Sequence, residues 1–293
     1  MRVLICSDGT DPADKPARLG GLIAGPCKAA TTLLGISESA PDEAPLRAAL
    51  ESEMKLLAGF GVEAELVVRK GDPVAQILEQ TSATNYDLVV IGTRGKQTSG
   101  RYWRSHRTYE VIKAIPPPVL VASGDPETLS KFLVCTGGKH YIEAAVKLTA
   151  EIAARVGASV TLLHVMAEPP AIFANLVRME EDVDGLLAGS SELGQNLLAQ
   201  KKSLEKMGVT TEVRIRHGIV LDQVFEELNE GEHDLIVTGS SQARGALQHY
   251  IMGDLTRRIV NRAPCPVLVA RPGAATRGSF WGAIKRAVFP ARA

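Results

Sequence analysis

An internal repeat covers most of this 293-residue chain and limits the number of structural units it can form. Three pairs of blocks define the repeat: residues 3–10 and 132–139, residues 86–92 and 233–239, and residues 115–122 and 263–270. The spacing between partners is 129 positions in the first pair, 147 in the second and 148 in the third. Because the blocks recur in the same order, the chain is a duplication of one long unit.

Each copy is far longer than a solenoid repeat and is about the size of a small domain. We therefore expect a first domain at residues 1–125, a second at residues 126–272, and a basic amphipathic tail at residues 273–293. The wider spacing in the middle of the repeat places an 18-residue insertion around residues 168–189. The insertion can be a flap over the second pocket, a contact surface or an extended crossover. The tail can lie on a membrane surface, dock on its own domain or stay disordered.

Short β-branched runs alternate with helix-period stripes in both copies. Runs such as residues 88–91 are apolar on both alternations, as expected for strands covered by helices on both faces. The pattern predicts two doubly wound α/β domains, Rossmann-like in class, each with a parallel sheet of about five strands. In the first copy, several Pro and Gly residues interrupt residues 11–30, so we expect a short or broken helix there.

Composition excludes several classes of function. The 33 basic and 33 acidic residues leave no net charge, so nucleic acid is not an expected partner. The longest stretch without a charged residue has 12 residues, whereas a membrane span needs roughly 18 to 20 apolar residues. Four sparse cysteines without a C-x-x-C pair fit a reducing cytoplasm, which is the expected location. The six histidines form no metal-binding spacing, and no nucleophile motif is visible, so we expect neither a metal site nor an enzyme.

Two turns are the candidate ligand site of the first copy. In an open parallel sheet, ligands bind beyond the carboxyl ends of the strands, which here selects residues 7–10 and 92–95. Glycines in such turns expose backbone N–H groups that suit a phosphate. Residues 88–109 contain no acidic residue and five Lys or Arg. This segment is either a polyphosphate pocket or a solvated basic loop.

Three motifs of the first copy carry a resemblance to the universal stress protein family: residues 71–73, 86–95 and 118–121. The second copy repeats the resemblance at residues 233–240 and 263–269. A tandem member of this family is implied to contain five-stranded parallel sheets of order 3-2-1-4-5, whose fifth strands pair across a two-domain or dimeric interface. Some members bind ATP through an Asp after the first strand and a motif G-x2-G-x9-G-[S/T].

The resemblance implies a nucleotide site in the first copy. Its predicted contact residues are Asp8, Gly9, Thr10, Gly92, Thr93, Arg94, Gly95, Ser105 and His106. The last glycine of the family motif falls on Ser105, where a side chain approaches the phosphates. The implied ligand is ATP, with Mg²⁺ when it is bound.

The second copy departs further from the motif. Gly137 replaces the Asp, Lys139 replaces a small hydroxyl residue, Ala243 replaces a glycine, and Asp254 occupies the Ser/Thr position. A carboxylate about 4 Å from a phosphate would cost on the order of 4 kcal/mol at an effective dielectric near 20. We therefore expect no ATP in the second copy.

The leading hypothesis is a non-enzymatic, nucleotide-responsive stress protein whose second domain is a degenerate partner. The alternatives are an interaction scaffold without nucleotide and, lower in rank, a slow ATPase or adenylyl transferase. The two copies are expected to form an intrachain pseudo-dimer. A further homodimer and an unidentified protein partner stay open.

Overall fold

The computed structural model describes residues 1–9, 14–38, 43–93, 106–137, 143–167, 183–239, 241–242, 250–251 and 253–271. The first half comprises β1 (Arg2–Ser7), α1 (Lys15–Cys27), β2 (Ala30–Ser37), α2 (Glu43–Gly59), β3 (Ala64–Lys70), α3 (Pro73–Ala83), β4 (Leu88–Gly92), α4 (His106–Ala114) and β5 (Val119–Ala122). The second half begins with β6 (Lys131–Cys135), α5 (Glu143–Val156), β7 (Ser159–Met166), α7 (Val183–Ala188), α8 (Glu192–Glu205) and β8 (Thr211–His217). It continues with α9 (Val220–Glu230), β9 (Leu235–Gly239), β10 (Ser241–Gln242), β11 (Tyr250–Ile251), α10 (Asp254–Arg262) and β12 (Val267–Ala270).

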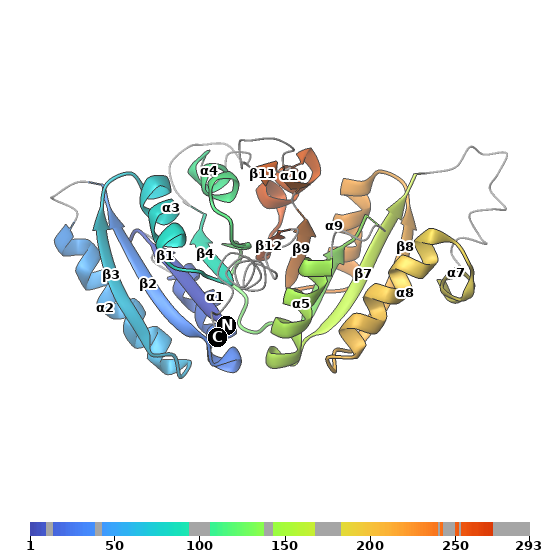
Figure 1. Cartoon of the computed structure of the whole chain (residues 1–293), viewed down its shortest axis with the longest axis horizontal. Helices are drawn as coiled ribbons and strands as arrows, with labels where there is room; N and C mark the ends of the chain where they lie inside the picture. The colour runs from blue at the N-terminus through green and yellow to red at the C-terminus, as the bar shows by residue number, and fades with distance from the viewer. Residues whose placement is uncertain are drawn as a thin grey trace, which may run out of the picture.

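The two halves share one ten-stranded sheet of order β3-β2-β1-β4-β5-β12-β9-β6-β7-β8 (Figure 1). Within each half the five strands of this sheet are parallel and follow the predicted order 3-2-1-4-5. β10 and β11 form a separate two-stranded antiparallel sheet in the second half. The predicted α/β class is therefore confirmed, and the two expected sheets are joined into one.

The join is an antiparallel pairing of β5 with β12, the fifth strands of the two halves. In its register Leu120 faces Leu268, which is the same position in the other copy of the repeat. The pairing thus lies on a pseudo-two-fold axis of the duplicated chain. The fifth-strand contact implied by the family resemblance is observed within one chain.

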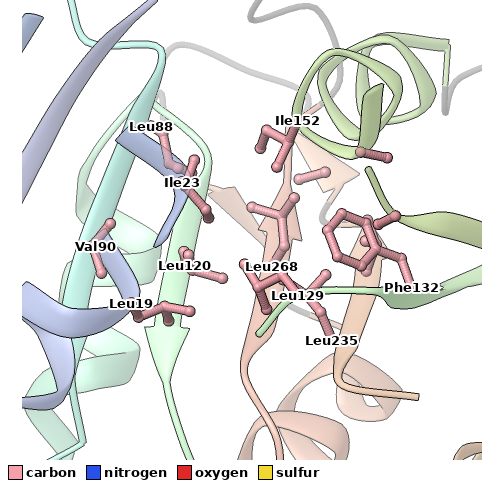
Figure 2. Packing of buried hydrophobic residues seen from close by; sticks show 14 of the residues in the cluster. Leu19, Ile23, Leu88, Val90, Leu120, Leu129, Phe132, Ile152, Leu235 and Leu268 are labelled. Carbon is pink, nitrogen blue, oxygen red and sulfur yellow. The ribbon is translucent and has the colours of Figure 1, made fainter. Parts of the chain in front are cut away.

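The apolar core continues across the join. On one face of the sheet, α1, α2, α5 and α8 contribute to a single buried cluster, which Figure 2 shows around the junction. Leu19 and Ile23 of α1 lie there with Leu120, and Phe132 and Ile152 approach from the second half. On the other face, α3, α4, α9 and α10 contribute to a second cluster. Each cluster contains residues of both halves, so the halves share their hydrophobic core.

Of the two expected forms of the first helix, short or broken, the broken one is wrong: α1 is shorter than the segment 11–30 but runs unbroken for 13 residues. Pro16 lies in its first turn, where no intrahelical bond is lost, and Pro26 lies in its last turn. Gly20 and Gly25 serve packing: an added Cβ would lie 2.4 Å from the Ile5 Cδ1 and 2.4 Å from the Phe60 carbonyl oxygen, respectively. The glycines that resemble helix breakers allow the helix to approach its neighbours closely.

The inserted segment is described only in part. Residues 168–182 lie outside the described residues, and the remainder forms α7, which packs against α8. The tail at residues 273–293 also lies outside the description. Across the described ranges, no helix combines the length and apolarity needed to cross a bilayer.

Candidate functional site

The two candidate turns of the first half lie side by side. β1 and β4 are parallel neighbours in which Cys6 pairs with Ile91, so Ser7 and Gly92 end their strands at the same edge. The turn after β1 carries Asp8, which is half-buried, and Gly9. The structure therefore brings Asp8 and Gly9 close to Gly92 and Thr93 at the carboxyl edge of the sheet.

A buried carboxylate on α2 holds the turn after β1. The Ser7 hydroxyl donates to Glu53 Oε1 at 2.5 Å, and the Gly9 N–H donates to Ser7 Oγ at 3.1 Å. Gly9 has φ +67°, and a Cβ there would lie 3.1 Å from both Ala49 and Leu46. The turn therefore needs a glycine, both for its left-handed backbone and for its approach to α2.

Sequence reasoning missed Glu53, which is only 2% exposed. It continues the buried stripe of α2 formed by Leu46, Leu50 and Leu57. A carboxylate inside an apolar helical stripe is the signal that could have identified it, since an ionisable side chain is rarely buried without a polar partner.

A small cationic hollow adjoins the tips of β4 and β5. The Thr93 hydroxyl donates to the Ala122 carbonyl oxygen at 3.4 Å, which fixes the end of β4 against β5. Beside this contact lies a hollow with an internal volume of only about 10 Å³, lined by Lys15, Arg18, Leu19, Ala122, Ser123, Gly124, Asp125 and Pro126. That volume is about what a single water molecule needs, so the hollow contributes cations at the carboxyl edge of the sheet and not a preformed ligand pocket.

Lys15 and Arg18 are the cations of this hollow, and sequence reasoning missed both. Lys15 is the first residue of α1, and Arg18 lies one turn later. Because α1 follows β1, both residues lie at the carboxyl edge of the sheet. Asp125 lies 3.8 Å from the Arg18 guanidinium and offsets part of its charge. One acidic and two basic side chains leave the hollow with a net positive charge, which favours an anion.

Several predicted site residues cannot be placed. Thr10, Arg94, Gly95 and Ser105 lie outside the described residues. His106 is the first residue of α4, and its side chain is outside the description. Since β4 and β5 are parallel neighbours, α4 begins at the carboxyl edge of the sheet, the same edge at which the two candidate turns lie.

The corresponding edge of the second half has different chemistry. His164 stands where the first copy has Gly35, and its Nδ1 lies 2.9 Å from the Thr136 carbonyl oxygen. Asp254 is the first residue of α10, and its carboxylate pairs with Arg258 at 2.9 Å. The first turn of α10 thus carries an acidic side chain. Lys139 and Ala243 lie outside the described residues.

Two kinds of chemical group can be checked among the described residues: metal-binding clusters and cysteine thiols. Among those residues, no group of three or more His, Cys, Asp or Glu side chains could hold a metal ion. Burial raises the pKa of Cys6, and burial together with Cys265 raises the pKa of Cys135 to about 12. Both thiols therefore stay protonated near neutral pH and are poor nucleophiles.

The chain resembles known proteins along most of its length. The model of the universal stress protein family matches it twice, at residues 1–123 and 128–271. A universal stress protein of Methanocaldococcus jannaschii is 28% identical over 142 residues, which cover 48% of this chain and 81% of the relative. One of Mycolicibacterium smegmatis is 24% identical over 238 residues, 77% of this chain and 76% of the relative.

Solved structures share the tandem architecture. The crystal structure of a putative universal stress protein from Pseudomonas aeruginosa has a TM-score of 0.68 at 15% identity, covering 92% of this chain and 93% of that one. A universal stress protein from Archaeoglobus fulgidus has a TM-score of 0.61 at 18% identity, covering 93% and 98%. At these identities the similarity concerns the fold alone. The two family matches, together with the duplicated 3-2-1-4-5 sheet, show that this chain belongs to the universal stress protein family.

Proposed function

We propose that this chain is a non-enzymatic stress-response protein that binds an adenine nucleotide, ATP with Mg²⁺, in its first domain, residues 1–125. The second domain, residues 126–272, serves as a degenerate partner that supplies an interface. The observation that carries the proposal is the placement of the Asp8–Gly9 turn beside Gly92 and Thr93, next to a hollow lined by Lys15 and Arg18.

Each part of this arrangement suits one part of the ligand. The Asp8 carboxylate is an acceptor for N–H or O–H groups of a base or sugar. Lys15 and Arg18 favour phosphate oxygens, and the amino terminus of α4 adds a positive partial charge at the same edge. Mg²⁺ would bind mainly through the phosphates, which is its usual mode in nucleotide sites and needs no dedicated protein cage.

Calorimetry with Mg-ATP on the full chain tests the proposal, with Asp8→Ala as the disrupting variant. We expect saturable binding that Asp8→Ala weakens by at least about tenfold, because a lost charge-assisted hydrogen bond is worth about 1.5–3 kcal/mol. The matched control is Glu63→Ala, an exposed acid that precedes β3 at the opposite edge of the sheet. Equal binding by Asp8→Ala and wild type would contradict the site.

A second variant separates phosphate recognition from base recognition. Lys15→Ala should weaken ATP by about fivefold or more and leave adenosine nearly unaffected, since in the proposed site the lysine would contact the phosphates and neither the base nor the sugar. Absence of heat with wild-type protein would favour the interaction scaffold. Phosphate release above a buffer blank would favour the ATPase.

A further inference from the structure

A buried arginine of the second half holds a helix of the first. Arg271 directly follows β12 and is only 1% exposed. Its guanidinium donates to the carbonyl oxygens of Ile112, Ile115 (3.2 Å) and Pro117 (3.3 Å). A buried charge is costly unless it is well hydrogen-bonded, so these carbonyls are strong partners of Arg271.

The carbonyls that Arg271 binds lie at the carboxyl end of α4. Ile112 is within the last turn of α4, and Ile115 and Pro117 follow the helix directly. A helix carries a partial negative charge at this end, so a cation here stabilises both the helix and its position. The opposite end of α4 lies at the carboxyl edge of the sheet, where the two candidate turns also lie, and there the same dipole favours an anion.

A second side chain from the second half fixes the middle of α4. Arg257 of α10 lies over the Tyr109 ring, 5.4 Å from its centroid. The first half makes a close approach in return, because a Cβ on Gly124 would lie 2.1 Å from the Pro264 carbonyl oxygen. The contacts that the two halves make with each other are not symmetric, however. At the repeat position of Arg271 the first half has Ser123, which carries no charge.

We propose that Arg271 is a positioning residue for the nucleotide site of the first domain. It holds α4 from its carboxyl end so that the amino-terminal N–H groups keep a fixed place against the phosphates. The second domain thereby completes a site in its neighbour. This inference rests on the proposed function and assigns to Arg271 a role in phosphate affinity specifically.

The test compares Arg271→Met, which removes the charge and the donors, with Arg271→Lys, which keeps the charge. The control is Arg258→Met on α10, whose exposed guanidinium pairs with Asp254. ATP and adenosine affinities are measured by calorimetry on the full chain, and amide hydrogen exchange is followed at residues 106–114 and, for comparison, in α2.

Arg271→Met should weaken ATP by about tenfold, equivalent to about 1.4 kcal/mol, and change adenosine less than twofold. Amide exchange should rise in α4 and stay unchanged in α2, and Arg271→Lys should recover part of the ATP affinity. Should Arg271→Met fail to fold, Arg271→Lys alone must show an ATP-specific loss, because an ammonium cannot reach all three carbonyls with the same geometry.

Two results would overturn the inference separately from the proposed function. If the wild type binds ATP and Arg271→Met binds it with equal affinity, the positioning role is refuted and the proposed nucleotide site is unaffected. Equal losses for ATP and adenosine would also refute it, since they indicate general disruption of the fold. Wild type that binds no nucleotide would overturn the proposed function and the inference with it.

Discussion

At the scale of single residues, the two halves differ in the acceptor that faces one arginine. Arg69 of the first half donates to the Gln80 amide oxygen at 2.9 Å, whereas Arg216, at the same repeat position of the second half, donates to the Glu227 carboxylate. In the first half Gln80 Nε2 donates to the Tyr86 hydroxyl at 2.8 Å, and Tyr86 donates to Thr32 Oγ1 at 3.2 Å. The repeat positions of Gln80 and Tyr86 hold Glu227 and His233. In the second half Glu227 accepts from Arg216 Nε at 2.7 Å, and the His233 ring lies 3.1 Å from the Glu227 carbonyl oxygen.

The replacement of Tyr86 by His233 at the same repeat position predicts that the stability of the folded chain depends on pH. Burial lowers the pKa of His233, and Lys131 adds to this, while contacts with Glu227 and Asp234 oppose it. The unfolded chain therefore binds the proton more tightly than the folded one, so stability should fall as the pH drops below about 6.5. His233→Phe should have a flatter profile of unfolding free energy between pH 7 and 5, measured by urea titration. Loss of the contact between the His233 ring and the Glu227 carbonyl oxygen lowers the unfolding free energy equally at every pH. A variant with the same slope as the wild type would therefore contradict the role of His233 in the pH dependence.

Individual site residues were predictable only where the local backbone conformation requires a particular residue type. Gly9 and Gly92 follow strand-like runs, and the turn chemistry there is local, so the sequence located both turns. Glu53 and Arg271 were missed because their role depends on which distant groups surround them after folding. A charged residue in a sequence is expected to be exposed to solvent, and only the tertiary contacts of the folded chain show that it is buried.

At the scale of elements, one helix lacks a cap that its repeat partner has. Asp72 caps α3 by accepting from the Ala75 N–H at 3.0 Å. The matching residue before α9 is Ile219, which offers no such bond and is 70% exposed. Because little of Ile219 is buried, the missing cap is not offset by packing.

Restoring this cap should stabilise the protein. Ile219→Asp is expected to raise the unfolding free energy by about 1 kcal/mol, the usual worth of an N-cap side chain. The control is Val220→Asp, which adds the same charge to the first turn without a capping position and should gain only about 0.3 kcal/mol. Urea unfolding measures both, and equal gains would mean that charge, not capping, is responsible.

Periodicity predicted the alternation of parallel strands and crossover helices, but it predicted neither α7 nor the antiparallel pair β10–β11, and it misjudged α1. Its glycines and prolines predict an interrupted helix when only local propensity is weighed. The Phe60 ring and backbone lie against Gly21 and Gly25, and this contact requires small residues in an intact helix. Tertiary packing therefore outweighs a propensity cost of roughly 1 kcal/mol per glycine.

At the scale of the whole molecule, the shared core predicts that the halves are not independent. Residues 1–125 alone would expose Leu19, Ile23 and the open edge of β5, which are buried in the full chain. Because Leu120 pairs with its own repeat position, a second copy of the fragment can replace the missing half in the same register. We expect a dimer or larger assembly by analytical ultracentrifugation.

A variant distinguishes specific pairing from general aggregation. Leu120→Lys places a charge at the centre of the pairing and should abolish the dimer of the fragment. A wild-type fragment that stays monomeric at micromolar concentration would show that the first half closes its own core.

The duplication and the strand order were predictable because repeated sequence blocks must fold alike. The merging of the two sheets was implied only by the family resemblance. The residues themselves could not predict it, because the apolar runs 119–122 and 267–270 would have the same sequence whether their strand edges were paired or free.

The contact of Tyr109 with Arg257 has a consequence for how such a chain can evolve. The two residues occupy one position of the repeat. In an assembly of identical subunits a residue near the symmetry axis meets its own copy, so tyrosine would face tyrosine and arginine would face arginine. Gene fusion removes that restriction. Each face can then mutate to suit an unlike opposite face, and heterologous chemistry becomes possible at a junction that arose from self-recognition.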